Sequence, residues 1–98
     1  MSARAHEEQL KKHRQMIDCL DQSIMANLGM RRELSKTIGE LKHNLGMPVT
    51  SLAREDDVLG KVLETAREIG MPDATARKLF TIIIQDCRQV QRSDGPQP

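Results

Sequence analysis

Four polar residues occupy positions where a helical pattern calls for solvent-facing or apolar side chains. Arg14, Arg31 and Lys42 lie on one long segment, and Gln91 lies near the end of the chain. A cationic group that faces a packed interior needs an anionic partner, because an unpaired buried charge is very costly. Together the four residues suggest a site for a small dianion.

The segment that carries three of these residues has the period of a helix. From about His6 to Leu45 there is no proline, and Arg31 belongs to a series that recurs every seven residues. Apart from Arg31, the members of this series are aliphatic: Leu10, Ile17, Ile24, Ile38 and Leu45. The period predicts one long helix, and Gly46 followed by Pro48 predicts its end.

Two glycines lie inside this predicted helix. Gly29 and Gly39 each cost up to about 1 kcal/mol relative to alanine, so they indicate either a break or a place of close packing. An unbroken helix would be roughly 60 Å long, whereas a compact domain of this size has a radius of gyration of about 13 Å. Such a helix cannot bury its apolar stripe alone, and dimerisation is the simplest way to cover it.

Two shorter helices are predicted in the second half of the chain. One begins near Ser51, which can cap it, and ends at Gly70 and Pro72. The other starts at or just after Asp73 and continues to about Val90. We therefore predict an all-α fold with one long and two shorter helices per chain.

The composition agrees with one small helical domain. Among 98 residues Phe80 is the only aromatic one, so the core must consist of aliphatic and methionine side chains, which favours helices. We expect a single domain over residues 1–92 and a disordered tail over residues 93–98. The formal charge of +1 argues against nucleic-acid or membrane binding, and no apolar run is long enough to span a bilayer.

The cysteines and the first residues bear on the compartment. Cys19 and Cys87 are the only two cysteines, and the charged residues 1–9 lack the apolar core of a signal peptide. We expect a reduced, cytoplasmic protein in which Cys19 is a small buried core residue. No spacing of cysteine and histidine suggests a zinc site.

Helical geometry indicates which of the polar residues could meet. Lys42 lies eleven residues after Arg31, about 16 Å along nearly the same face, so both side chains could reach one ligand. Arg14 lies roughly 40 Å from Lys42 along the same helix, so it could serve that pocket only if two chains run antiparallel. On the last helix Gln91 follows Cys87 by one turn, and both can face inward.

Three of these residues also have a purely structural interpretation. Arg31 could form an ion pair with Glu33, Glu40 or a residue of another helix. Gln91 could be an exposed helix end, and Cys87 a small buried core residue.

The order and spacing of the motifs resemble those of the all-helical, class II chorismate mutases. The likeness covers nearly the whole chain, from about Lys12 to Gln91. It is carried by residues 13–21 (HRQMIDCLD), residues 30–34 (MRREL), Lys42, Met47-Pro48-Val49, Arg54-Glu55, Val58-Leu59, residues 80–84 and Gln91.

This resemblance implies an intertwined homodimer with two equivalent pockets, each completed by Arg14 of the other chain. The implied reaction is the Claisen-type rearrangement of chorismate to prephenate, which needs no cofactor. By the same resemblance Lys42 and Gln91 would stabilise negative charge on the enolpyruvyl oxygen of the transition state. Arg31 and the partner's Arg14 would hold the two carboxylates, and Glu55 would accept the ring hydroxyl.

Two implied substrate-binding positions depart from the family's pattern. Ser51 stands where many relatives have aspartate, although its backbone amide can still face the ligand. Cys87 stands where many have serine, and a thiol is the weaker hydrogen-bond donor to the ring carboxylate. Arg54 is expected to brace Glu55 or the adjoining loop.

Other functions remain open. An isochorismate pyruvate lyase or a 4-amino-4-deoxychorismate mutase would use the same fold, although Glu55 beside Arg54 favours a mutase over a lyase. A non-enzymatic dimeric helical adaptor is a further alternative, in which Arg31 and Lys42 pair with acids across the helix interface. The adaptor predicts that a substitution at Lys42 disturbs folding, whereas the enzyme predicts a folded protein without turnover.

Overall fold

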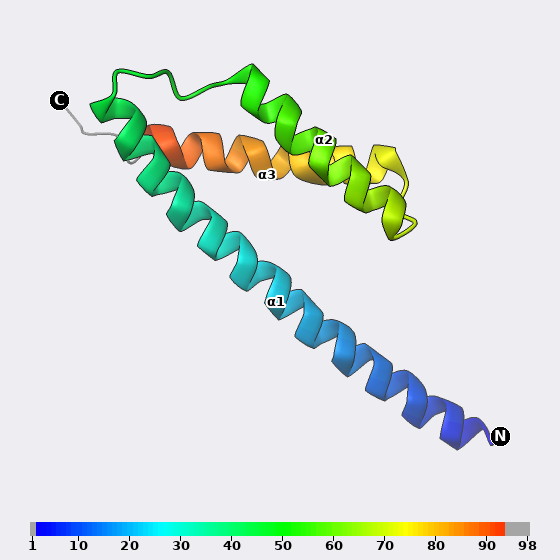
Figure 1. Ribbon diagram of the computed structural model, residues 1–98. Coiled ribbons are helices and arrows are strands. Elements are labelled where there is room, and N and C mark those ends of the chain that lie inside the picture. Colours follow the sequence, from blue (N-terminus) through cyan, green and yellow to red (C-terminus); the bar gives the residue numbers. More distant parts are fainter. Residues whose placement is uncertain (1, 94–98) are drawn as a thin grey trace. The chain divides into compact units, whose positions relative to one another are not determined.

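The computed structural model describes residues 2–93, all but a few of which belong to three helices (Figure 1). These are α1 (Ala3–Asn44), α2 (Leu52–Glu68) and α3 (Asp73–Ser93). No strand occurs in this part of the chain, so the predicted all-α fold with one long and two shorter helices is confirmed. The predicted tail begins at Ser93, which is the last residue of α3, and residues 94–98 lie outside the described residues.

The chain divides into two compact units, Met1–Met30 and Arg31–Pro98. The described part of the first unit is the beginning of α1. Its start is capped by Ser2, whose Oγ accepts a hydrogen bond from the backbone N–H of Ala5 at 3.2 Å.

The apolar side chains of this first unit are exposed. Leu10 is 50% exposed, and Ile17 and Ile24 are each 56% exposed. Cys19 is exposed as well, so its predicted position in a buried core is wrong for the single chain. The unit contains only one helix, which has no second apolar surface within the unit to pack against.

In the second unit, two glycines end helices α1 and α2. Gly46 and Gly70 have φ angles of 68° and 75°, in the left-handed region that glycine adopts without strain. After each glycine a backbone N–H returns to the last turn of the helix, from Met47 to the Lys42 carbonyl and from Met71 to the Ala66 carbonyl, both at 2.8 Å. This is the Schellman pattern of hydrogen bonds, and it satisfies carbonyls that the helix itself leaves free.

Helices α2 and α3 lie side by side (Figure 1), and a small apolar core lies between them. Leu63 and Ala66 of α2 and Ala76 of α3 are buried there, with Val62 and Met71 packed against them. Two of the three buried residues are alanines, so the core contains little apolar volume.

The C-terminal part of α1 comes very close to α3. A Cβ atom added to Gly39 would lie 2.9 Å from Cα and 3.0 Å from the carbonyl oxygen of Gln91, whereas one added to Gly29 would meet nothing within 4 Å. Gly39 therefore marks close packing and not a break in the helix. The short side chain of Ser35, one turn earlier, is also buried.

Within residues 2–93, none of the helices combines the length and the apolar character needed to cross a bilayer.

Candidate active site

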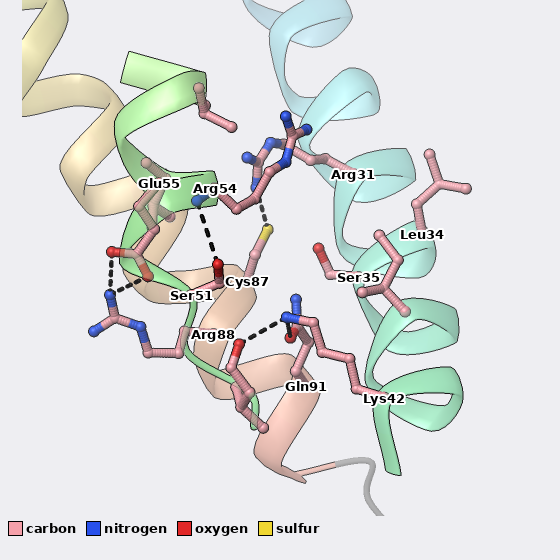
Figure 2. Close-up of a pocket in the computed structure, with 14 residues that line it drawn as sticks. Arg31, Leu34, Ser35, Lys42, Ser51, Arg54, Glu55, Cys87, Arg88 and Gln91 are labelled. Atoms are coloured by element: carbon pink, nitrogen blue, oxygen red, sulfur yellow. Dashed lines mark hydrogen bonds and ion pairs between the residues drawn. The ribbon is translucent and has the colours of Figure 1, made fainter. Parts of the chain in front are cut away.

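A cavity of about 310 Å³ lies within the second unit, where the end of α1, the loop after it, the start of α2 and the end of α3 meet (Figure 2). Its lining includes six residues that were predicted for the site from the sequence: Arg31, Lys42, Ser51, Glu55, Cys87 and Gln91. Apolar side chains complete the wall, namely Leu34, Ile38, Val49, Val58 and Ile84. The structure thus brings these six residues together, and the role of each stays a prediction.

Lys42 is fixed in the cavity by two hydrogen bonds. Its Nζ donates to the carbonyl oxygen of Val49 at 2.7 Å and to Oε1 of Gln91 at 3.0 Å (Figure 2). An ammonium group has three protons, so one donor of Lys42 remains for a ligand. Because lysine can only donate, the oxygen of the Gln91 amide faces it, and the amide nitrogen with two protons is left for another acceptor.

Arg31 reaches the same cavity from three turns before Lys42 on α1. Its Nη1 donates to Sγ of Cys87 at 2.7 Å. The ion pairs found among the described residues include neither Arg31 nor Lys42, so the alternative pairing with Glu33 or Glu40 is not seen.

The purely structural interpretation is correct for Cys87 but not for Gln91. Cys87 is only 5% exposed, so it is a small buried residue as well as part of the cavity wall. Gln91 is half-buried and bonded to Lys42, and is therefore not a freely exposed helix end.

Glu55, in the first turn of α2, is held by a residue that the sequence reasoning missed. Nη2 of Arg88 donates to both carboxylate oxygens of Glu55, at 2.5 and 2.6 Å (Figure 2). The two side chains are 22% and 27% exposed, Glu55 first. A helical spacing could have revealed Arg88, because Ile84, Cys87, Arg88 and Gln91 stand at positions i, i+3, i+4 and i+7 of one helix face.

The expectation that Arg54 braces Glu55 or the adjoining loop is not met by its guanidinium. It lines the cavity and pairs instead with Asp57, through Nη1 and Oδ2 at 2.6 Å. Asp57 also faces Lys61 at 3.4 Å. The hydrogen bond and charge of Lys61, and then those of Arg54, lower the pKa of Asp57 below its ordinary value.

Ser51 caps α2 at the edge of the cavity. Its Oγ accepts a hydrogen bond from the backbone N–H of Arg54 at 3.3 Å, as an N-cap residue does. The hydroxyl proton of Ser51 is not used in this bond and remains available to a ligand.

Arg14 lies in the first unit, where its side chain is exposed. Its predicted contribution to the site of a second chain stays a prediction.

Two of the cationic side chains that line the cavity have no acidic partner among residues 2–93. Four of the lining residues are cations and one is an acid, Glu55. Arg88 is neutralised by Glu55 and Arg54 by Asp57, whereas Arg31 and Lys42 have no acidic partner among residues 2–93. Such a cavity matches an anion with two negative charges. In the same part of the chain, no three His, Cys, Asp or Glu side chains are grouped so as to hold a metal ion.

The chain is all-helical, and its three helices meet at a cavity that four cationic side chains line. These features are typical of a helical protein that binds a small dianion. The sequence pattern of the family described as chorismate mutase type II matches residues 13–92, so the chain belongs to this family. The predicted family and the predicted enzyme class, an isomerase of the chorismate mutase type, are thereby confirmed.

Individual relatives agree with this assignment. A chorismate mutase from Methanocaldococcus jannaschii is 27% identical over 85 residues, which are 87% of this chain and 86% of that protein. A bifunctional chorismate mutase/prephenate dehydratase from Aquifex aeolicus is 30% identical over 88 residues, and this chain spans only 24% of its length. Among solved structures, a conserved hypothetical protein from Pyrococcus furiosus matches with a TM-score of 0.66 and 31% identity, over 85% of this chain and 95% of that one.

Proposed function

We propose that the cavity binds chorismate and accelerates its rearrangement to prephenate. In this reaction the ether C–O bond breaks while a C–C bond forms within the same molecule, and no proton is gained or lost. The protein's task is to hold the reactive conformation and to stabilise the charge that develops. The observation that carries the proposal is the pair of donors left free on Lys42 and Gln91, in a cavity where Arg31 and Lys42 have no acidic partner among residues 2–93.

Lys42 and Gln91 act on the ether oxygen. As its bond to the ring breaks, this oxygen becomes more negative than in the ground state, so a fixed ammonium and an amide N–H bind the transition state more tightly. The bonds from Lys42 to Val49 and Gln91 set both donors in place before the substrate arrives. No reorganisation is then needed during the reaction.

Arg31 binds one of the two substrate carboxylates, together with Cys87, with which it is in contact. A guanidinium suits a carboxylate because its donors form two parallel hydrogen bonds. Arg14 of a second chain binds the other carboxylate. Fixing both ends brings the two reacting carbons together and removes much of the entropic cost of the reactive conformation.

Glu55 accepts the hydrogen bond of the ring hydroxyl. Among the described residues it is the only acidic one in the cavity wall. A carboxylate repels the two carboxylates of chorismate, and the hydroxyl is the one hydrogen-bond donor that this substrate offers. Ser51 lies beside this region and has a hydroxyl proton to donate.

The functional molecule is an intertwined homodimer. The support is the exposed aliphatic series of α1, which continues from Leu10 to Ile38 without cover in the single chain. Two free cysteines support the further proposal of a reducing, cytoplasmic compartment.

Two enzymatic alternatives use the same cavity, namely isochorismate pyruvate lyase and 4-amino-4-deoxychorismate mutase activity. In the adaptor alternative the acids that pair with Arg31 and Lys42 would have to come from the second chain, because none is found among residues 2–93. An adaptor would also have no use for a cavity with free donors.

Product analysis tests the proposal. The purified protein is incubated separately with chorismate, isochorismate and 4-amino-4-deoxychorismate, and the products are identified by NMR. We expect prephenate from chorismate. Salicylate with pyruvate, or aminoprephenate alone, would assign one of the sister activities, and no product from any of the three would support the adaptor.

Lys42→Met tests the mechanism in the same assay. Removing the ammonium should lower kcat by about 100- to 1000-fold, as the loss of one preorganised donor does in other enzymes. Lys36→Met is the matched control, because Lys36 is an exposed lysine on another face of α1 and does not line the cavity. Thermal unfolding of both variants shows whether the fold is kept, and an unfolded Lys42→Met with a folded but inactive control would favour the adaptor.

A further inference from the structure

Within residues 2–93, the ion pair between Arg88 and Glu55 is the one charged contact in the cavity that joins α2 to α3. It links both oxygens of Glu55 to one guanidinium nitrogen, and both side chains are mostly buried. Nε of Arg88 is buried without a hydrogen-bond partner among the described residues. The pair is therefore placed by the packing of the two helices and is not a mobile surface contact.

We propose that Arg88 positions Glu55 and makes the site select a neutral ring hydroxyl over a ring ammonium group. The inference rests on the proposed function, in which Glu55 receives the substituent on the ring. It names the feature of this chain that separates chorismate from its 4-amino analogue.

The geometry of the contact between Arg88 and Glu55 fixes the position of the carboxylate. A contact that reaches both oxygens fixes the direction as well as the distance of the carboxylate. Each carboxylate oxygen has two lone pairs, so each can still accept one hydrogen bond from the ring while it is bonded to Arg88. Figure 2 shows the guanidinium of Arg88 turned to the carboxylate of Glu55, with Ser51 and Cys87 nearby in the wall.

The charge of the Glu55–Arg88 pair determines which ring substituent the site prefers. Glu55 and Arg88 together are neutral, and a neutral pair gains little from a cation placed beside it. A primary aliphatic amine, like that of lysine, is protonated at neutral pH, so the 4-amino substrate would bring a positive charge next to the guanidinium. A hydroxyl meets no such repulsion. A lone Glu55 would reverse the preference, because hydrogen bonds between two charged groups are the stronger ones.

Steady-state kinetics on chorismate and 4-amino-4-deoxychorismate test this inference. In Arg88→Met we expect KM for chorismate to rise by about tenfold with a smaller change in kcat, and the ratio of kcat/KM values, chorismate over amino substrate, to fall by about tenfold or more. Arg77→Met is the matched control: Arg77 is an exposed arginine of the same helix that does not line the cavity, and its substitution should change neither quantity.

Two further variants separate position from charge. Arg88→Lys keeps the positive charge but lacks the planar guanidinium group, so KM for chorismate should rise. The ratio of the kcat/KM values for the two substrates should stay near that of the unchanged protein. In a Glu55→Gln background, Arg88→Met should cause no further rise in KM for chorismate, because the carboxylate that Arg88 positions is already gone. Should Arg88→Met not fold, as circular dichroism would show, Arg88→Gln removes the charge while retaining a donor, and the ratio should fall in the same way.

An equal loss on both substrates in the folded, charge-removing variants would overturn the inference and leave the proposed function intact. Absence of prephenate from the unchanged protein would instead overturn the proposed function and the inference with it.

Discussion

Individual side chains of the cavity differ in how many hydrogen-bonding groups they have left for a ligand. Lys42 keeps one donor and the Gln91 amide keeps two, whereas Arg88 is engaged with Glu55. Cys87 is the weak member of this set, because a thiol is both a poorer donor and a poorer acceptor than a hydroxyl. Its Sγ nevertheless accepts the hydrogen bond from Arg31 that orients the guanidinium.

Cys87→Ser should therefore improve substrate binding. A serine hydroxyl makes the stronger hydrogen bond, and a net gain of about 0.5–1 kcal/mol would lower KM for chorismate two- to fivefold. We expect kcat to change less than KM, because the proposed function assigns Cys87 to a carboxylate and not to the ether oxygen. Steady-state kinetics of prephenate formation check this, with Cys87→Ala as the comparison that removes the group. A large change in kcat at constant KM would show that Cys87 acts on the reacting bond.

The sequence predicts which residues line the cavity better than it predicts the contacts between them. Lys42, Cys87 and Gln91 were found because their spacing on a helix can be read directly from the chain. The bond between Arg88 and Glu55 joins residues 33 positions apart, and it depends on how far α2 and α3 are shifted along each other. That shift is set by side-chain packing, which the helical period does not contain.

The helices themselves follow from local sequence, which is why their ends could be predicted closely. Gly46 and Gly70 stop α1 and α2 by adopting positive φ, a property of the residue and not of its surroundings. Gly39 is different. The sequence left open whether it breaks α1, and only the position of α3 shows that it allows a close approach to Gln91.

Gly39→Ala should damage activity although alanine is the better helix former. The added Cβ would lie 2.9 Å from the backbone of Gln91, so the end of α3 would have to move and carry the Gln91 amide away from Lys42. We expect kcat to fall at least tenfold, and overpacking to reduce stability by about 1–3 kcal/mol.

Gly60→Ala is the control for this substitution. Gly60 lies inside α2, and a Cβ there meets nothing within 4 Å, so the change should raise stability by up to about 1 kcal/mol and leave kcat unchanged. Thermal unfolding and steady-state kinetics measure both effects. Equal activity of the two variants would show that the approach of α1 to α3 is not needed to place Gln91.

A single chain leaves much of its apolar surface exposed. The aliphatic series of α1 is exposed from Leu10 to Ile38, and the buried core between α2 and α3 consists of Leu63 and two alanines, with two partly buried side chains packed against them. A chain of 98 residues with so small a core would be marginal alone, so its stability should depend on association. The sequence predicts this dependence on association, because a helix as long as α1 cannot bury its apolar stripe alone.

Mixing two inactive variants tests whether association also completes the active site. If Arg14 serves the cavity of the other chain, a mixed dimer of Arg14→Ala and Lys42→Ala chains contains one site with both residues intact. Joint unfolding and refolding of equal amounts makes about half of the dimers mixed, so activity should recover to about a quarter of that of the unchanged protein. Arg31→Ala mixed with Lys42→Ala should recover none, because these two residues line the cavity of the same chain. No recovery in the first mixture, with dimers confirmed by light scattering, would show that Arg14 does not act across the interface.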